Sequence, residues 1–159
     1  MRYLIVSLMV LMISCMPRTT DGQVHMSVTF NLGEQPAWGP VGYDYVEYYY
    51  FPDIEVYYSV PLRVYYYYDG GRWINVSSLP SRYRSYDVYH SYKVVINERD
   101  PWRRNDVYRT KYASYKGRSG QPVIRDSKDP KYFVNKNHPE HKRWKQEQGN
   151  GKQKGKRKG

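Results

Sequence analysis

The residue spacing closest to a metal-binding motif lies near the C-terminus. His138 and His141 are three positions apart, a spacing at which two imidazoles can hold one metal ion, and Glu140 would add an oxygen ligand. Pro139 lies inside the motif and the neighbouring chain is polar. We therefore favour a solvated loop over a metal site.

Two carboxylates, Asp53 and Glu55, alternate along the chain and suggest a pair suited to glycoside hydrolysis. Because Arg63 is expected on the same face, a surface charge cluster is the better interpretation. No serine lies in a Gly-x-Ser-x-Gly context, and no Gly-rich loop follows a strand in a nucleotide-binding arrangement. The sequence therefore predicts a protein that is not an enzyme and uses no metal or cofactor.

Tyrosine dominates the composition, with 20 Tyr against 3 Phe, and fifteen of the tyrosines fall between residues 43 and 92. In this region Asp69-Gly70-Gly71 is typical of a three-residue hairpin loop, which would pair Tyr67 with Trp73 and Tyr66 with Ile74. A second three-residue loop over 59–61 would pair Val56 with Val64. These registers predict a core face of Ile54, Val56, Tyr58, Leu62, Val64, Tyr66, Ile74 and Val76.

The reverse face of this predicted sheet is aromatic and is the candidate ligand site. It comprises Tyr57, Arg63, Tyr65, Tyr67, Trp73 and Asn75, with Glu55 beside them. Such a surface can stack sugar rings or bases and hydrogen-bond their substituents. The alternative, which we favour, is that a helix or an N-terminal strand covers the face and makes it part of a second packed layer.

The elements that must position these residues can be read from periodicity and end signals. Residues 24–30 alternate as a half-buried strand does, and Val94–Ile96 forms one more strand. A helix is expected to begin with Asp100 as N-cap and Pro101 at its first position, and to stop at Lys116-Gly117. Its buried side would carry Tyr108, Tyr112 and Tyr115. The fold class is mainly β (α+β): a small antiparallel meander sheet with one C-terminal helix.

Three segments are expected along the 159 residues: a signal peptide over 1–22, one small β-rich domain over 23–137 and a disordered Lys/Gly-rich tail over 138–159. The apolar run Leu4–Ile13 has the length of a signal-peptide core and is too short for a membrane span. Processing at Cys15, the sole cysteine, would give a lipoprotein, and a cut before Gln23 would give a soluble chain. The single cysteine excludes an internal disulfide.

The net charge of +11 is concentrated in the tail, where eight Lys/Arg face two Glu after residue 137. Such a segment buries too little apolar surface to offset its ordering entropy. We expect salt-sensitive attraction to anionic polymers without defined geometry.

The runs Gln35-Pro36-Ala37-Trp38-Gly39-Pro40, Glu47-Tyr48-Tyr49-Tyr50-Phe51-Pro52-Asp53-Ile54, Gly70-Gly71-Arg72-Trp73 and Leu79-Pro80-Ser81-Arg82-Tyr83 form an ordered series. Over residues 35–102 this series resembles a family of small exported proteins of Bacteroidetes-type Gram-negative bacteria. The resemblance implies an envelope location and a mature chain beginning near Gln23. It carries over no catalytic or binding residue.

Together these observations predict an exported protein of the periplasm, outer membrane or cell surface that works by binding. Its first expected role is structural or interactive, through association of the basic tail with anionic envelope polymers. The alternative is a glycan-binding module that uses the aromatic face. Membrane contact would require the lipid at Cys15, and export argues against a nucleic-acid partner.

Overall fold

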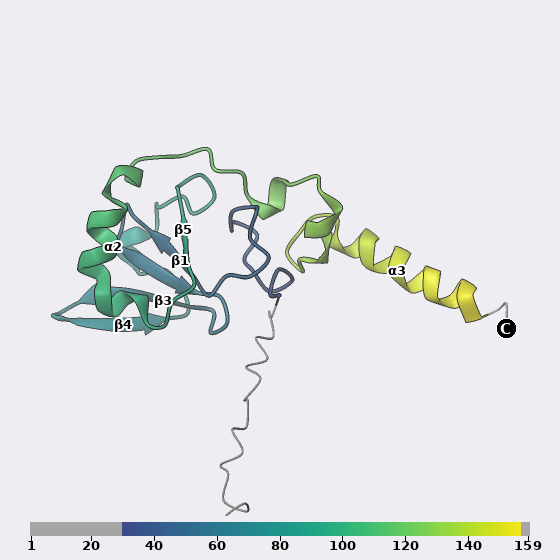
Figure 1. The fold of residues 1–159 in the computed structure, drawn as a ribbon, viewed down its shortest axis with the longest axis horizontal. Coiled ribbons are helices and arrows are strands. Elements are labelled where there is room, and N and C mark those ends of the chain that lie inside the picture. The colour runs from purple at the N-terminus through teal and green to yellow at the C-terminus, as the bar shows by residue number, and fades with distance from the viewer. Residues whose placement is uncertain (1–29, 157–159) are drawn as a thin grey trace, which may run out of the picture.

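The structure is a computed structural model that describes residues 30–156, with side chains as far as Gly149 (Figure 1). The predicted signal peptide, the processing positions Cys15 and Gln23, and the strand expected over 24–30 lie outside the described residues, except for Phe30, which is exposed and belongs to no strand. No helix within the described part of the chain is long and apolar enough to cross a membrane.

The centre of the fold is a five-stranded antiparallel sheet, which confirms the predicted mainly β class. Its strands are β1 (Tyr48–Phe51), β2 (Val56–Ser59), β3 (Val64–Asp69), β4 (Arg72–Val76) and β5 (Val94–Ile96). The order is β4-β3-β2-β1-β5, so that four strands form a meander and the fifth returns beside β1. Residues 94–96 are a strand, as expected.

The predicted register of the β3–β4 hairpin is wrong by one residue. The loop contains two residues, Gly70 and Gly71, both with positive φ (55° and 80°), and Asp69 pairs with Arg72. Two positive φ values in succession match the twist of the strands, and Gly-Gly adopts them without steric cost. As a result Tyr67 pairs with Ile74, and Tyr68 with Trp73.

The β2–β3 connection also differs from the prediction, but it is longer, with four residues over 60–63 where three were expected. It is closed by a hydrogen bond from the Arg63 N–H to the Ser59 carbonyl at 2.8 Å, and Arg63 has a φ of 56°. The β1–β2 connection repeats this design, with Glu55 at a φ of 53° bonded to Phe51. Ser59 therefore pairs with Val64.

Because both registers were wrong, the side chains of β3 were assigned to the wrong faces of the sheet. The faces predicted for the side chains of β2 and β4 are correct. Tyr65 and Tyr67, predicted on the ligand face, pack into the core with Val56. Tyr66, predicted in the core, lies on the reverse face with Tyr57. We call these two sides the core face, which contains Tyr49, Phe51, Val56, Tyr58, Tyr65 and Tyr67, and the helix-covered face, which contains Tyr48, Tyr50, Tyr57, Tyr66 and Trp73.

The predicted helix over 101–115 is present in three short pieces: a 3-10 turn at Pro101–Arg104, the helix α2 at Asn105–Lys111 and a 3-10 turn at Ala113–Tyr115. The first piece begins where predicted, with Asp100 at the N-cap position and Pro101 next, but Asp100 has a φ of 46° and its side chain bonds no backbone N–H of the turn. Tyr108 is buried against Tyr57, which shows that α2 covers one side of the sheet (Figure 1).

The Gly/Pro-rich stretch over 31–42 is packed against the core face. Trp38 contacts the rings of Tyr49, Phe51 and Tyr58 at centroid distances of 5.1–5.4 Å. Pro40 forms a bridge with Val123 in the segment that leaves α2. This segment, whose position the sequence leaves open, continues through 3-10 turns at Ile124–Asp126 and Pro130–Val134.

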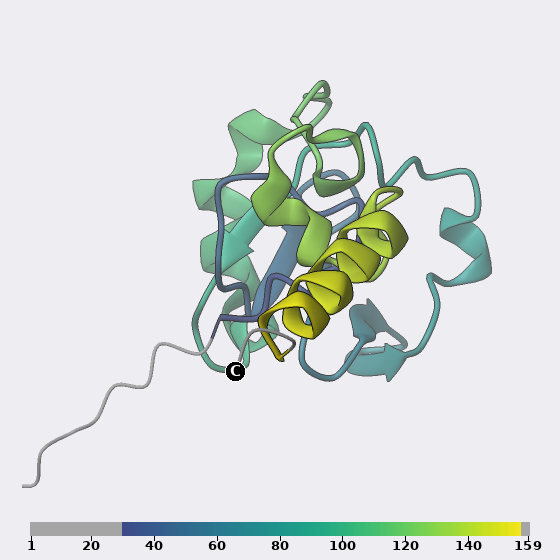
Figure 2. The same ribbon diagram turned by 90° about the vertical axis from the view of Figure 1, so that its right-hand side faces the viewer.

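The predicted boundary of the tail at His138 is wrong, because His138 is only 5% exposed and packs against Phe133. The helix α3 follows at His141–Lys156, and His141 and Trp144 in its first turns are half-buried. Figure 1 shows α3 extending beyond the sheet domain, and Figure 2 looks onto the helix from its free side; α3 contacts the 3-10 turn at Pro130–Val134.

Candidate functional site

The structure divides the six predicted site residues among three places. Tyr57, Trp73 and Asn75 belong to the side of the sheet that α2 covers, and Tyr65 and Tyr67 lie on the core face. Arg63 is in the β2–β3 loop, where it forms an ion pair with Glu34. The six residues therefore do not form one surface.

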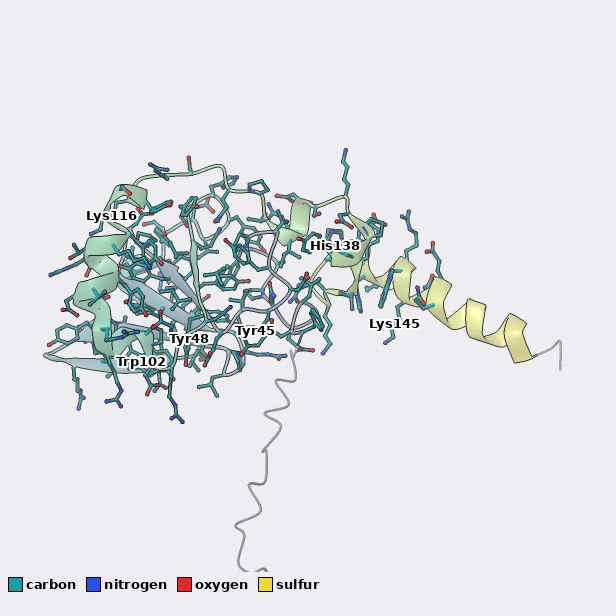
Figure 3. The ribbon with its side chains drawn as sticks, viewed as in Figure 1. Tyr45, Tyr48, Trp102, Lys116, His138 and Lys145 are labelled. Atoms are coloured by element: carbon teal, nitrogen blue, oxygen red, sulfur yellow. The ribbon has the colours of Figure 1, made fainter. Side chains whose placement is uncertain are left out.

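The middle of the helix-covered face is closed to a ligand. Tyr57 is fully buried, and its hydroxyl donates to Oδ1 of Asn105, the first residue of α2, at 2.8 Å. Burial raises the pKa of Tyr57 well above its ordinary value. The covered arrangement favoured from the sequence is therefore found here. Figure 3 shows Tyr48 and Trp102 next to one another at this layer, with ring centroids 5.5 Å apart.

An open groove remains where the β3–β4 hairpin extends past α2. Two hollows of about 350 and 470 Å³ share Glu55, Tyr68, Trp73 and Asn105. We call this the Trp73 groove. Its lining residues are Asp53, Ile54, Glu55, Tyr68, Trp73, Tyr83, Trp102, Arg103, Asn105, Asp106 and Arg109.

Aromatic rings supply the apolar part of the Trp73 groove. Tyr68 is 55% exposed, and its ring meets the half-buried Trp73 at a centroid distance of 5.5 Å and an angle of 63°. Trp73 is supported from the sheet side by Tyr57 at 5.7 Å. Trp102 stacks on Tyr66 with centroids 3.7 Å apart. The rings are thus fixed by packing before any ligand arrives.

Carboxylate and amide groups line the other side, and hydrogen bonds hold them in place. Glu55 accepts from Nζ of Lys116 at 3.0 Å and from Nδ2 of Asn105 at 3.4 Å. Asp53 accepts from the Gly117 N–H at 2.6 Å and from the Tyr86 hydroxyl at 3.1 Å. Each carboxylate therefore ties the β1–β2 loop to another part of the chain. The basic partner predicted for this charge cluster was wrong: Arg63 pairs with Glu34, and Lys116 takes its place at Glu55.

The His138-x-x-His141 motif is structural. Nδ1 of His138 accepts the Glu140 N–H at 3.0 Å, so Nε2 carries the proton and donates to the Ser127 carbonyl at 3.0 Å. Nδ1 of His141 lies 2.8 Å from the Phe133 carbonyl, to which it donates. The expectation of a solvated loop was wrong, since His138 is buried. Within residues 30–156 no group of three or more side chains of metal-ligating type is arranged to hold an ion.

Another hollow, of about 380 Å³, lies at the base of α3 and is basic. Arg125, Lys128 and Arg143 line it together with Phe133 and His138. Arg143 pairs with Glu140, and Arg125 pairs with Asp126 while its guanidinium lies 3.9 Å from the centre of the Tyr89 ring. The hollow adds positive charge next to the basic helix.

Lys93 is an ionisable residue that sequence reasoning missed. It is 1% exposed, and its Nζ donates to the carbonyls of Val88 at 2.7 Å and Tyr89 at 3.3 Å. Burial lowers the pKa of Lys93 to about 8. Its position just before the expected strand Val94–Ile96 is a weak sequence signal, because a lysine at a strand end usually faces water.

Comparison with known proteins does not identify the chain: no protein-family model, curated protein or solved structure matches it. The resemblance in residues 35–102 therefore stays a prediction.

Proposed function

We propose that this protein is an exported, non-enzymatic binding protein of the cell envelope whose Trp73 groove takes a glycan. The observation that carries the proposal is the combination of ring faces with fixed polar groups in one hollow. Tyr68, Trp73 and Trp102 offer aromatic surface, and Glu55 and Asn105 offer hydrogen-bonding groups that are already positioned. Ligand sites commonly combine aromatic walls with a few fixed polar groups in this way.

The groove suits sugar rings because a pyranose combines an apolar face of C–H groups with a polar rim of hydroxyls. Its axial C–H groups can lie on the ring of Tyr68 or Trp73, and its hydroxyls can reach Asn105 and the carboxylates. No bond of the sugar is broken in this function.

Titration calorimetry with peptidoglycan-derived disaccharides and neutral hexose oligosaccharides tests the proposal. Tyr68→Ala removes a ring that is 55% exposed, and we expect affinity to fall about tenfold. Tyr43→Ala is the matched control, since Tyr43 is 41% exposed and does not line the groove. Equal effects of the two substitutions, or no binding by the unaltered protein to either sugar class, would contradict a glycan site in this groove.

The basic C-terminal region supports a second function, association with anionic envelope polymers. Residues 141–156 contain six Lys/Arg and one Glu, and Arg125 and Lys128 add charge at the base of α3. The attraction is expected to be long-ranged and to weaken as salt screens it.

A shortened chain ending at Gln148 tests this second function. It removes five Lys/Arg and keeps the buried His138 and the half-buried Trp144, whose loss would disturb the domain. Binding to lipopolysaccharide and to polyphosphate should weaken strongly, while binding to neutral oligosaccharides stays unchanged. If the shortened chain binds both polyanions as well as the full chain does, the basic tail is not the binding element.

A further inference from the structure

The outer edge of β4 carries backbone groups that no described residue satisfies. Asp69 and Arg72 flank a two-residue loop and so form a hydrogen-bonded pair. Along β4, residues that hydrogen-bond to β3 then alternate with residues that do not. Arg72, Ile74 and Val76 consequently bond to β3. The N–H and C=O groups of Trp73 and Asn75 point away from the sheet, and no hydrogen bond from them is found in residues 30–156.

At the opposite edge of the sheet, another part of the chain bonds to the backbone just before β5. Next to β5, the Gln121 side chain accepts the Lys93 N–H at 3.0 Å and donates to the Lys93 carbonyl at 3.1 Å. Ser91 and Ser119 form a bridge just before β5. The chain over 118–121 therefore covers the approach to β5, whereas Figures 1 and 2 show the β3–β4 hairpin at the periphery of the ribbon.

β4 also lacks the features that usually prevent edge pairing. It has no proline and no bulge, and Arg72 at one end is its only charged residue. Its centre alternates Trp73, Ile74 and Asn75, of which Asn75 is exposed. An extended edge of this composition can accept another strand.

We propose that β4 is a self-association edge, where two copies of this chain pair their β4 strands antiparallel about a two-fold axis at Ile74. In this register Trp73 pairs with Asn75 of the partner subunit, so the free N–H and C=O groups on each strand face one another. Ile74 lies opposite the partner's Ile74, in the close, non-hydrogen-bonded position. The register uses the full length of β4.

Charge and symmetry favour this occupant over an unrelated peptide. The two copies of Arg72 lie at opposite ends of the joint, opposite the partner's Val76, and therefore do not repel each other closely. The aliphatic side chains of Ile74 meet on one side of the joined sheet. A two-fold interface of this kind is closed and does not propagate into a fibre.

The joint would also bring two Trp73 grooves to the same side of one continuous sheet, because the axis is perpendicular to the sheet. This consequence rests on the proposed glycan function and predicts tighter binding of a polymer than of a disaccharide. Self-association itself is measured without any sugar, so failure of one proposal is distinguishable from failure of the other.

Sedimentation velocity of the full chain over a range of concentrations tests the proposal. We expect a monomer–dimer equilibrium that Asn75→Pro weakens about tenfold, because proline removes one outward N–H from each strand and leaves the inward ladder intact. Asn75→Lys should weaken it through charge repulsion at the axis, whereas Val107→Lys, on the exposed side of α2, should not. Circular dichroism verifies that each variant is folded.

Disulfide trapping in a Cys15→Ser background tests the register. Ile74→Cys places the two thiols about 4.5 Å apart at Cα, within bonding range, and should yield a covalent dimer. Val76→Cys lies on the same face, but in this register its thiol is four residues, about 13 Å, from the thiol of the partner subunit. This variant should therefore not form a covalent dimer. A chain that is monomeric at every concentration, a dimer insensitive to both Asn75 variants, or a dimer that Ile74→Cys fails to trap would each overturn the proposal.

Discussion

The hydroxyl of Tyr49 on β1 donates to Oε1 of Gln35 at 2.8 Å, and both side chains are fully buried. Nε2 of Gln35 in turn donates to Oδ1 of Asn31 at 3.1 Å and to the Tyr43 carbonyl at 3.2 Å. The stretch before β1 is therefore fixed to the core face by a polar network as well as by Trp38. Burial raises the pKa of Tyr49 well above its ordinary value, so the donor keeps its proton.

Adjacent tyrosines on β1 should respond in opposite ways to the loss of a hydroxyl. Tyr49→Phe leaves the buried Gln35 oxygen without a donor and should cost about 1–3 kcal/mol of unfolding free energy. The hydroxyl of Tyr50 is buried and finds no partner among the described residues, so Tyr50→Phe should leave stability unchanged or raise it. Urea denaturation of both variants measures the difference. Equal losses at the two positions would disprove the network.

Gly39 should not tolerate a methyl group, for reasons of space. A Cβ at this position would lie 2.5 Å from the Tyr49 hydroxyl and 3.0 Å from the Pro36 carbonyl. Gly39→Ala is therefore expected to destabilise by about 1–3 kcal/mol. Gly149→Ala on α3 meets nothing within 4 Å and should cost nothing.

Combining Gly39→Ala with Tyr49→Phe identifies the source of this strain. The hydroxyl that would collide with the new methyl group is absent from the double variant, so its loss of stability should be smaller than the two single losses added together. Simple additivity would place the strain at the Pro36 carbonyl or at the Tyr49 ring carbon Cζ, each 3.0 Å from the added Cβ.

Hairpins were predictable from the sequence, and their registers were not. Asp69-Gly70-Gly71 fits a loop of three residues or of two, and only the positive φ of both glycines decides between them. Glu55 and Arg63 adopt the left-handed conformation without being glycine, so no residue type marks the ends of these four-residue loops. Each predicted register was wrong by an odd number of residues. Because side chains alternate between the two faces of a strand, these errors assigned the β3 side chains to the wrong faces.

The candidate site was only partly predictable for the same reason. Trp73 was expected to contribute to a ligand surface and it does line the groove, yet Tyr68 was not expected there because the wrong register placed it beside Arg72. Asn105 and Trp102 also line the groove, and they come from the α2 region, more than 25 residues after Trp73 in the chain. Tertiary packing of α2 brings them together, and no local pattern encodes it.

Lys93 should make stability rise with pH in an alkaline range. Its pKa is about 8 in the folded chain and 10.5 in its ordinary state, so the folded state binds fewer protons between these values. The contribution of Lys93 to the free energy of unfolding is fully present above pH 10.5 and is lost as the pH falls towards 8. The total change in the free energy of unfolding is roughly 3 kcal/mol. Burial raises the pKa of Tyr48 and Tyr65 to about 12, which has the opposite sign and lowers stability above pH 10.

Stability should therefore reach its maximum near pH 10, and urea midpoints between pH 7.5 and 11 measure it. Lys93→Met removes the titrating group, so the rise between pH 8 and 10 should disappear even though the variant also loses two hydrogen bonds. The fall above pH 10 should persist, because the tyrosines remain. A rise that survives in Lys93→Met would have to come from another group.

The β3–β4 register can be tested by energetic coupling, since cross-strand neighbours on one face interact. Tyr67 and Ile74 pair directly, so Tyr67→Ser and Ile74→Ala should each destabilise, and their combination should deviate from additivity by about 0.5–1 kcal/mol. Tyr66 is one residue out of register with Ile74 and lies on the opposite side of the sheet, against Trp102. Tyr66→Ser and Ile74→Ala should therefore be additive to within about 0.5 kcal/mol. Coupling of Ile74 with Tyr66 in place of Tyr67 would restore the three-residue loop, turn Tyr68 away from Trp73 and remove the groove.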